Sequence, residues 1–241
     1  MFGACMSEKQ SKIMGFLMSF LLIIAMLLVA KESAELVNVI NLKEEKEEQK
    51  TVVIDAGHGG IDPGKVGIND ALEKDINLEI ALKVKKYLEQ QDINVIMTRE
   101  TDGGLYEEND TNKKVRDMKN RLSIIEEAEP ELAVSIHQNS YPEESVSGMQ
   151  VFYYQDSAEG AKAALMMQQT MIENLKPQKE REAKENGTYY LLKKTSVPII
   201  IVECGFLSNS TEAELLTKSS YQEKCAWAIQ LGILRYLNMA D

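Results

Sequence analysis

Histidine and cysteine are scarce in this chain of 241 residues, and basic residues are fewer than acidic ones. It has two histidines and three cysteines, and its 27 lysines and arginines are outnumbered by 38 aspartates and glutamates, for a formal net charge of −11. The acidic balance argues against a nucleic-acid partner, which would require a basic face. Three cysteines do not make a disulfide framework either.

The cysteines fall in three different settings. Cys5 precedes a long apolar segment, on what we expect to be the cytoplasmic side of a membrane. Cys204 lies at the end of a predicted strand and Cys225 on a predicted helix, so the simplest interpretation is two buried thiols. A bridge between Cys204 and Cys225 remains open at this point.

Long apolar runs are absent except near the N-terminus. Residues 13–30 are apolar or small and carry no charge. An 18-residue helix is about 27 Å long, close to the thickness of a bilayer core. Lys9 and Lys12 precede it, which predicts a cytoplasmic segment 1–12 and export of the rest. Lys31 and Glu32 stand where a signal-peptide cleavage site is expected, which favours a retained transmembrane anchor over a cleaved signal.

Residues 31–50 are rich in charge and predict a solvated linker, and residues 51–241 then predict a single catalytic domain. Short apolar runs alternate there with helical patterns, which indicates an α/β fold with helices on both faces of the sheet. Candidate strands cover 51–55, 93–98, 132–136, 148–154, 188–193 and 198–203. Candidate helices cover 75–90, 113–128, 157–175 and about 220–237, and loops cover 99–112 and 176–187.

The two histidines both follow predicted strands. His58 comes after the run 51–57, and His137 comes after the run 132–136. Neutral imidazole is the most common metal ligand in proteins, and the strand ends of open α/β sheets are where such folds bind ligands. Either histidine alone could equally be a loop residue that is hydrogen-bonded to the backbone. Their shared placement favours a metal site.

Two glutamates complete this pattern. Glu73 opens a predicted helix, and Glu203 ends the most apolar run of the chain, where a carboxylate is costly to bury unless it is paired or bound to a cation. Two histidines and one glutamate are the three protein ligands typical of catalytic zinc, with one coordination position left open. The other glutamate is then available to move a proton in a metal-assisted hydrolysis.

Four segments together resemble one enzyme family. His58 begins the run His-Gly-Gly-x-Asp-Pro-Gly, Glu73 begins Glu-Lys-Asp-x-Asn-Leu-Glu-Ile-Ala, His137 lies in Ser-Ile-His-x-Asn, and Glu203 lies in Val-Glu-x-Gly-Phe-Leu-Ser-Asn. These segments are similar to those of zinc-dependent N-acetylmuramoyl-L-alanine amidases of the amidase-3 type. The similarity extends from about Thr51 to Leu237.

The resemblance implies one Zn²⁺ per chain, with His58, Glu73 and His137 as ligands and Glu203 as the catalytic glutamate. It implies hydrolysis of the amide between the lactyl group of N-acetylmuramic acid and the L-alanine of the stem peptide. It also implies a twisted mixed sheet of about six strands. The layout, with an N-terminal hydrophobic helix and no wall-binding repeats, is most like the germination-specific amidases of spore formers. That likeness implies a role in spore cortex maturation, with formation of muramic δ-lactam, at the forespore or cortex face of a membrane.

Other functions remain possible at this stage. The chain could be a catalytically inactive wall-binding or scaffold protein of the same fold, or a metallopeptidase that cuts another peptidoglycan bond. Without a wall-binding module, a partner protein could activate or target it. Asn139 is a candidate substrate contact, and so are the arginines, although solvated surface is the simpler interpretation for each arginine: Arg99, Arg116, Arg121 and Arg181. Asp55 either orients an imidazole or forms a turn, and Asn77 is interpreted as structural.

Overall fold

The computed structural model describes residues 8–44 and 49–239, which fall into two compact units, Met1–Glu48 and Gln49–Asp241. The first unit contains helix α1, Glu8–Glu44. Within it, Lys12–Glu35 has a mean hydropathy of 2.8 and is fully exposed, so it is long and apolar enough to cross a membrane. A signal sequence has the same properties. Cys5 and residues 45–48 of the charged linker lie outside the described residues.

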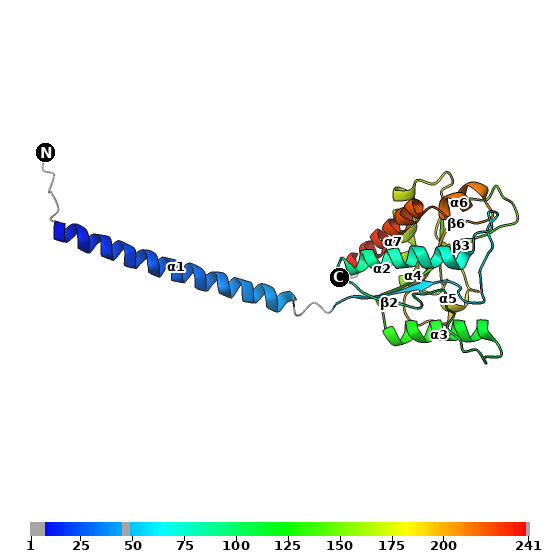
Figure 1. The fold of residues 1–241 in the computed structure, drawn as a ribbon, viewed down its shortest axis with the longest axis horizontal. Coiled ribbons are helices and arrows are strands. Elements are labelled where there is room, and N and C mark those ends of the chain that lie inside the picture. Colours follow the sequence, from blue (N-terminus) through cyan, green and yellow to red (C-terminus); the bar gives the residue numbers. More distant parts are fainter. Residues whose placement is uncertain (1–7, 45–48, 240–241) are drawn as a thin grey trace. The chain divides into compact units, whose positions relative to one another are not determined.

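The second unit is built on one mixed six-stranded sheet (Figure 1). Its strands are β1 (Thr51–Ala56), β2 (Asn94–Met97), β3 (Leu132–Asn139), β4 (Gln150–Tyr153), β5 (Lys184–Glu185) and β6 (Ile199–Phe206). They lie in the order β2-β1-β3-β6-β4-β5. Strands β2, β1, β3 and β6 are parallel, and β4 runs antiparallel to β6. The predicted α/β class and mixed sheet are therefore confirmed.

Helices cover both faces of this sheet, as the apolar strands predicted. The helices are α2 (Glu73–Glu89), α3 (Lys113–Ala128), α4 (Ala158–Leu175), α5 (Tyr190–Lys194), α6 (Ser210–Leu216) and α7 (Ser219–Met239). Helices α2, α4, α6 and α7 pack with one face of the strands in the larger apolar cluster, and α3 and α5 contribute to a smaller cluster on the other face. Figure 1 shows α2 and α3 on opposite sides of the sheet.

One predicted element is wrong in type. Residues 188–193 were expected to form a strand, because they are aromatic and apolar, but Tyr190–Lys194 forms helix α5. Asn186 bends the chain before it by accepting hydrogen bonds from the backbone N–H groups of Thr188 and Tyr189. The two leucines of α5 are then buried side by side in the smaller cluster. The short strand β5 and helix α6 were not predicted.

The strand order creates a site at one edge of the sheet. From β1 the chain crosses to β2 on one side and then to β3 on the other, so β1 and β3 are neighbours at a topological switch point. In open α/β sheets, the loops at such a point diverge and leave a crevice at the carboxyl ends of the strands. His58 follows β1 and His137 lies near the end of β3.

Candidate active site

The loop after β1 presents His58 in an uncommon backbone conformation. Its φ is 62°, in the left-handed region, which non-glycine residues rarely occupy. Reciprocal backbone hydrogen bonds between Gly59 and Asp62 close the loop at 3.0 and 3.1 Å. The backbone carbonyl of His58 also accepts a hydrogen bond from the buried guanidinium of Arg121. The backbone at His58 is thus fixed by the closed loop that follows it and by the hydrogen bond from Arg121.

Two buried arginines support the same loop from below. Arg99 donates to four backbone carbonyls, which are those of Ala56, Gly57, Lys74 and Thr101. Arg121 donates to the carbonyl of Ala56 as well as to that of His58. They are only 5% and 1% exposed, so the interpretation of these two arginines as solvated surface is wrong. Arg99 does not line the cleft described below, so the structure does not support Arg99 as a substrate contact.

The charge of Arg121 is balanced by two carboxylates. Its side chain lies 2.6 Å from Asp55 of β1 and 2.6 Å from Asp117 of α3. Burial raises the pKa of Asp55, but the charge of Arg121 and the hydroxyl hydrogen bonds from Ser135 and Thr98 outweigh it and lower this pKa to about 2. Asp55 therefore neither orients an imidazole directly nor forms a turn. It pairs with the arginine beneath the site.

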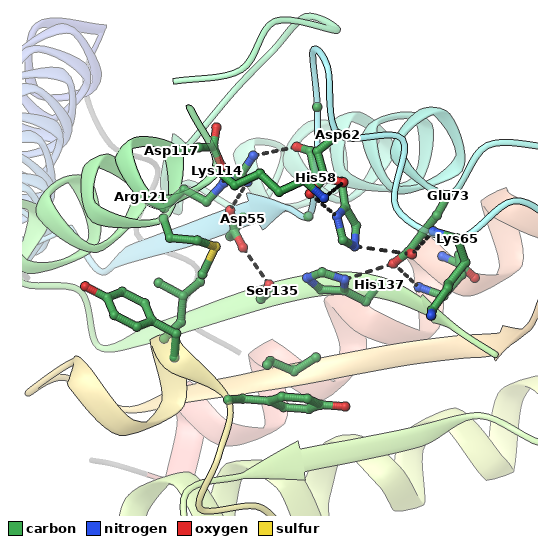
Figure 2. Close-up of a pocket in the computed structure, with 18 of the residues that line it drawn as sticks. Asp55, His58, Asp62, Lys65, Glu73, Lys114, Asp117, Arg121, Ser135 and His137 are labelled. Carbon is green, nitrogen blue, oxygen red and sulfur yellow. Dashed lines mark hydrogen bonds and ion pairs between the residues drawn. The ribbon is translucent and has the colours of Figure 1, made fainter. Parts of the chain in front are cut away.

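Three possible metal ligands converge above this network (Figure 2). His58 Nε2 lies 3.2 Å from one carboxylate oxygen of Glu73, and His137 Nδ1 lies 2.9 Å from the other. One ligand atom from each residue falls within 4.8 Å of the other two, so the three could hold one metal ion. The predicted cluster of His58, Glu73 and His137 thus exists in the structure.

The carboxylate of Glu73 is buried and held by several donors. It accepts hydrogen bonds from the backbone N–H groups of Lys65 and Gln138, at 2.8 and 3.1 Å. Burial raises its pKa, yet the hydrogen bonds from His137 and His58 and their charges lower it well below the ordinary value. In turn, burial lowers the pKa of His137, and its hydrogen bond with Glu73 raises that pKa above the ordinary value. The cluster favours an ionised carboxylate.

Two glycines make room for this cluster. A Cβ on Gly57 would lie 2.3 Å from the ring of His137, and a Cβ on Gly64 would lie 2.6 Å from Glu73 and 2.7 Å from His58. Gly64 also has a φ of 68°, which favours glycine. Glycine at positions 57 and 64 is therefore a steric requirement of the ligand geometry.

Glu203 faces the same cleft from β6. It is paired in register with His137 on the neighbouring parallel strand, so both side chains project from the same face of the sheet. Glu203 is 7% exposed, and its Oε2 atom has no hydrogen-bond partner in the described structure. Burial raises the pKa of Glu203 to about 7, although the charge of His137 acts in the opposite direction. A carboxylate with this pKa exchanges protons readily near neutral pH.

The cleft around these residues has a volume of about 450 Å³. It runs between the ends of β1, β3 and β6 and helices α3 and α5, and its lining includes all four predicted functional residues. Apolar side chains form part of the wall, including Met118, Tyr189, Leu191 and Ile201. The arrangement combines a mixed nitrogen and oxygen ligand cluster with a nearby proton acceptor.

The two remaining substrate candidates differ in position. Asn139 lines the cleft, and its side chain accepts a hydrogen bond from the N–H of Ser140. Arg181 does not line the cleft, because its Nε donates to the backbone carbonyl of Ser147 and its guanidinium stacks over the ring of Phe206 at 4.9 Å. The geometry thus keeps Asn139 as a candidate and gives Arg181 a role in loop packing.

Sequence reasoning missed several side chains near the cluster. Asn77 donates to Gly57 O at 3.1 Å and to Glu73 at 3.4 Å, and it accepts from Gln138 at 3.1 Å. Its spacing of four residues from Glu73 on one helix was a signal that could have found it. Asp62, which contacts His58, lies in the His-Gly-Gly-x-Asp-Pro-Gly segment, where the sequence alone indicates no role for it. Cys204 and Cys225, for which the sequence left a disulfide bridge open, are both buried free thiols.

Comparison with known proteins decides which family has this site. A model of the N-acetylmuramoyl-L-alanine amidase family matches residues 52–235. The chain belongs to that family. It is an amidase that hydrolyses the bond between N-acetylmuramic acid and L-alanine in peptidoglycan. The predicted activity is therefore confirmed, in preference to an inactive scaffold or the cleavage of another bond.

Individual relatives of the amidase match about four fifths of the chain. The germination-specific N-acetylmuramoyl-L-alanine amidase of Bacillus subtilis (strain 168) is 43% identical over 190 residues, which are 78% of this chain and 79% of that protein. The CwlD amidase of Clostridioides difficile, solved in complex with the GerS lipoprotein, is 41% identical with a TM-score of 0.76 and covers 79% of this chain and 100% of that one. The catalytic domain of CwlV from Bacillus (Paenibacillus) polymyxa var. colistinus is 31% identical with a TM-score of 0.70, over 79% of this chain and 99% of that one.

Proposed function

We propose that the amidase binds one zinc ion through His58, Glu73 and His137, and that Glu203 transfers the proton in hydrolysis. The donor set supports zinc, because two imidazole nitrogens and one carboxylate are the ligands of many catalytic zinc sites. The carboxylate lies between the two imidazoles and is ionised, as a ligand must be. When bound, zinc would supply a Lewis acid for the scissile carbonyl.

Glu203 is placed to act as both base and acid. The water that attacks the scissile carbonyl gives a proton to Glu203, which then passes it to the leaving nitrogen of alanine. The single observation that carries this role is a buried carboxylate oxygen without a partner, opposite His137 and facing the cleft. A pKa of about 7 suits both halves of the transfer.

The test replaces Glu203 with glutamine, which has nearly the same shape and cannot accept a proton. We expect Glu203→Gln to keep wild-type zinc content and to lose about 100-fold to 10,000-fold in the rate of muropeptide cleavage. Glu185→Gln, on the exposed edge strand β5, is the matched control and should cleave at the wild-type rate. Mass spectrometry of the products measures the rate, and turnover near the wild-type level in Glu203→Gln would contradict the role.

We also propose that α1 anchors the amidase in a membrane, with the catalytic unit outside the cytoplasm and acting on spore cortex. The apolar span Lys12–Glu35 supports the anchor, and the identity to a germination-specific amidase supports the substrate. Expression in a B. subtilis strain that lacks this relative tests the role. Muramic δ-lactam should return to the cortex with the wild-type chain and not with Glu203→Gln, and its absence with both would contradict the cortex role.

A protein partner at the membrane surface is part of this proposal. The C. difficile relative was solved with a lipoprotein, and we propose that a lipoprotein similarly assists this amidase. The purified full-length chain in detergent, loaded with zinc, should then cleave muropeptides slowly. Full activity in the absence of any partner would contradict this requirement.

A further inference from the structure

The two ring nitrogens of His58 face different carboxylates. Nε2 points to Glu73 at 3.2 Å, inside the ligand cluster, and Nδ1 points away from it to Asp62 at 3.0 Å (Figure 2). A neutral imidazole carries its proton on one nitrogen and a lone pair on the other. Both carboxylates can accept that proton, but Glu73 already accepts hydrogen bonds from His137 and from the backbone N–H groups of Lys65 and Gln138. Asp62 is the nearer of the two carboxylates, so it takes the proton at Nδ1 and leaves the lone pair on Nε2.

Asp62 is itself held in place on both sides. Its backbone is fixed by the two hydrogen bonds with Gly59, and its Oδ1 atom accepts from the backbone N–H of Gly64 at 3.4 Å. The same Oδ1 atom accepts from Lys114 Nζ at 2.8 Å, which leaves Oδ2 for His58. Lys114 belongs to the first turn of α3. The same helix also contacts this loop through Arg121, which donates to His58 O.

His137 has a different arrangement. Its Nδ1 faces Glu73, and the edge of the ring that carries Nε2 lies against Gly57, where an added Cβ would be 2.3 Å away. Packing against the backbone thus fixes that ring. His58 is on an exposed loop with a quarter of its side chain accessible, so it needs a hydrogen bond to fix its orientation.

We propose that Asp62 is a positioning residue that holds His58 in the Nδ1–H tautomer with Nε2 directed at the metal site, and that Lys114 fixes Asp62 from α3. The inference rests on the proposed zinc site and deepens it. It links the helix that forms one wall of the cleft to the geometry of a metal ligand. Outer partners of metal-bound histidines typically change metal affinity by about 10-fold to 100-fold when they are removed.

Nuclear magnetic resonance can read the tautomer directly, because the chain has two histidines. The full-length amidase in detergent is labelled with ¹⁵N-histidine and freed of metal with a chelator, and the spectrum is recorded at about pH 9, well above the reference pKa of about 6.5 for free imidazole. His58→Ala assigns the signals. We expect His58 to show a protonated Nδ1 in the wild type. In Asp62→Ala the proton should move toward Nε2, which still faces Glu73.

Zinc affinity is the second measurement on the same variants. Asp62→Ala should weaken zinc binding by about 10-fold to 100-fold, and Asp62→Asn, which keeps an uncharged acceptor, should fall between Asp62→Ala and the wild type. An unchanged tautomer and unchanged zinc affinity in Asp62→Ala would overturn the inference. If Asp62→Ala does not fold, as judged by circular dichroism, Asp62→Asn carries the same test.

Lys114 has a matched control next to it. Lys114→Ala should weaken zinc binding by a few-fold, since it leaves the contact between Asp62 and His58 but releases the second oxygen. Lys113→Ala removes the same charge from the same helical turn, where the side chain lies near Glu108 and over Tyr106, and should bind zinc like the wild type. Equal effects of the two substitutions would overturn the role of Lys114.

The outcomes separate this inference from the proposed zinc site. A wild-type chain that binds no zinc contradicts the zinc site, whereas the tautomer of the metal-free protein still tests Asp62. A wild-type chain that binds zinc, with the same affinity in Asp62→Ala, contradicts the positioning role alone.

Discussion

The two faces of the sheet are built differently although the same strands form both. On the face toward α2, α4 and α7, the residues of the central strands are aliphatic: Val52, Ile54 and Ala56 of β1, Val134 and Ile136 of β3, and Ile200 and Val202 of β6. On the face toward α3 and α5, the corresponding positions near the strand ends are polar or ionisable: Asp55, Ser135, His137 and Glu203. One face supplies stability from apolar burial, and the other combines a smaller apolar cluster with the cleft.

This difference shows how a buried strand can carry chemistry. Successive side chains alternate between the faces, so replacing every second residue leaves the larger core intact. The charges on the other face are costly to bury, and the structure compensates them by pairing, as with Arg121 between Asp55 and Asp117. Substitutions on the two faces should therefore have separable effects.

Among the substitutions that test this comparison of the two faces, the largest effect should come from crowding the ligand cluster. Gly57→Ala places a methyl group 2.3 Å from the ring of His137, so the imidazole has to move. We expect at least a 100-fold loss of amidase activity, on the order of the effect of a 1 Å misplacement at a reacting centre. Gly15→Ala, on α1 with nothing within 4 Å, is the control. Muropeptide digestion measures both, and wild-type activity in Gly57→Ala would contradict the geometry.

The next comparison sets one residue from each face against the other. Arg121→Met leaves Asp55 buried without its cation and should cost about 3–5 kcal/mol in the free energy of unfolding, together with weaker zinc binding. Ile80→Ala, in the core formed by α2, should cost about 2–5 kcal/mol and leave zinc affinity unchanged. Urea unfolding and zinc titration measure the two quantities. Zinc binding that weakens equally in both variants would contradict the separation of the faces.

A smaller effect should appear in the dependence of stability on pH. The pKa of Asp55 is about 2 in the folded state, below its ordinary value of 3.8. The ionised form is therefore stabilised by folding, and its contribution of about 2 kcal/mol is present above pH 4 and lost as the pH falls toward 2. The difference in free energy of unfolding between the wild type and Asp55→Asn should narrow by this amount over that interval. A constant difference from pH 6 to pH 2 would count against the pairing.

The smallest effect is expected for Arg181. Its side chain packs on Phe206 and binds Ser147 O, outside the cleft. Arg181→Ala should change KM for muropeptides by less than about twofold, with at most a modest loss of stability, of the order of 1 kcal/mol. A tenfold rise in KM at unchanged kcat would instead restore the substrate contact that the sequence suggested.

The apolar pattern was sufficient to predict most of the fold. The strands at 51–55, 132–136 and 198–203 and the four long helices were found because burial on two faces or one stripe leaves a strong signal. Residues 188–193 were mistaken for a strand, because the choice between strand and short helix was made by Asn186 and by packing on β6, not by the local composition. The two-residue strand β5 is too short to leave a pattern.

The candidate site was predictable to a similar degree. Its four principal residues lie in recognisable segments, and the structure places His58, Glu73, His137 and Glu203 around one cleft. The sequence could not distinguish the buried Arg99 and Arg121 from surface arginines, since Ala56 O, which both contact, and Asp55, which pairs with Arg121, are distant along the chain. Lys114 was missed for the same reason, because its contact with Asp62 spans 52 residues.

The most direct test of the account is the zinc content of the purified full-length amidase after incubation with zinc and removal of the excess, measured by atomic emission. The proposed site predicts one zinc per chain in the wild type and almost none in His58→Ala, with both proteins folded by circular dichroism. A folded wild-type chain without zinc, or a His58→Ala variant that keeps a full equivalent, would contradict it.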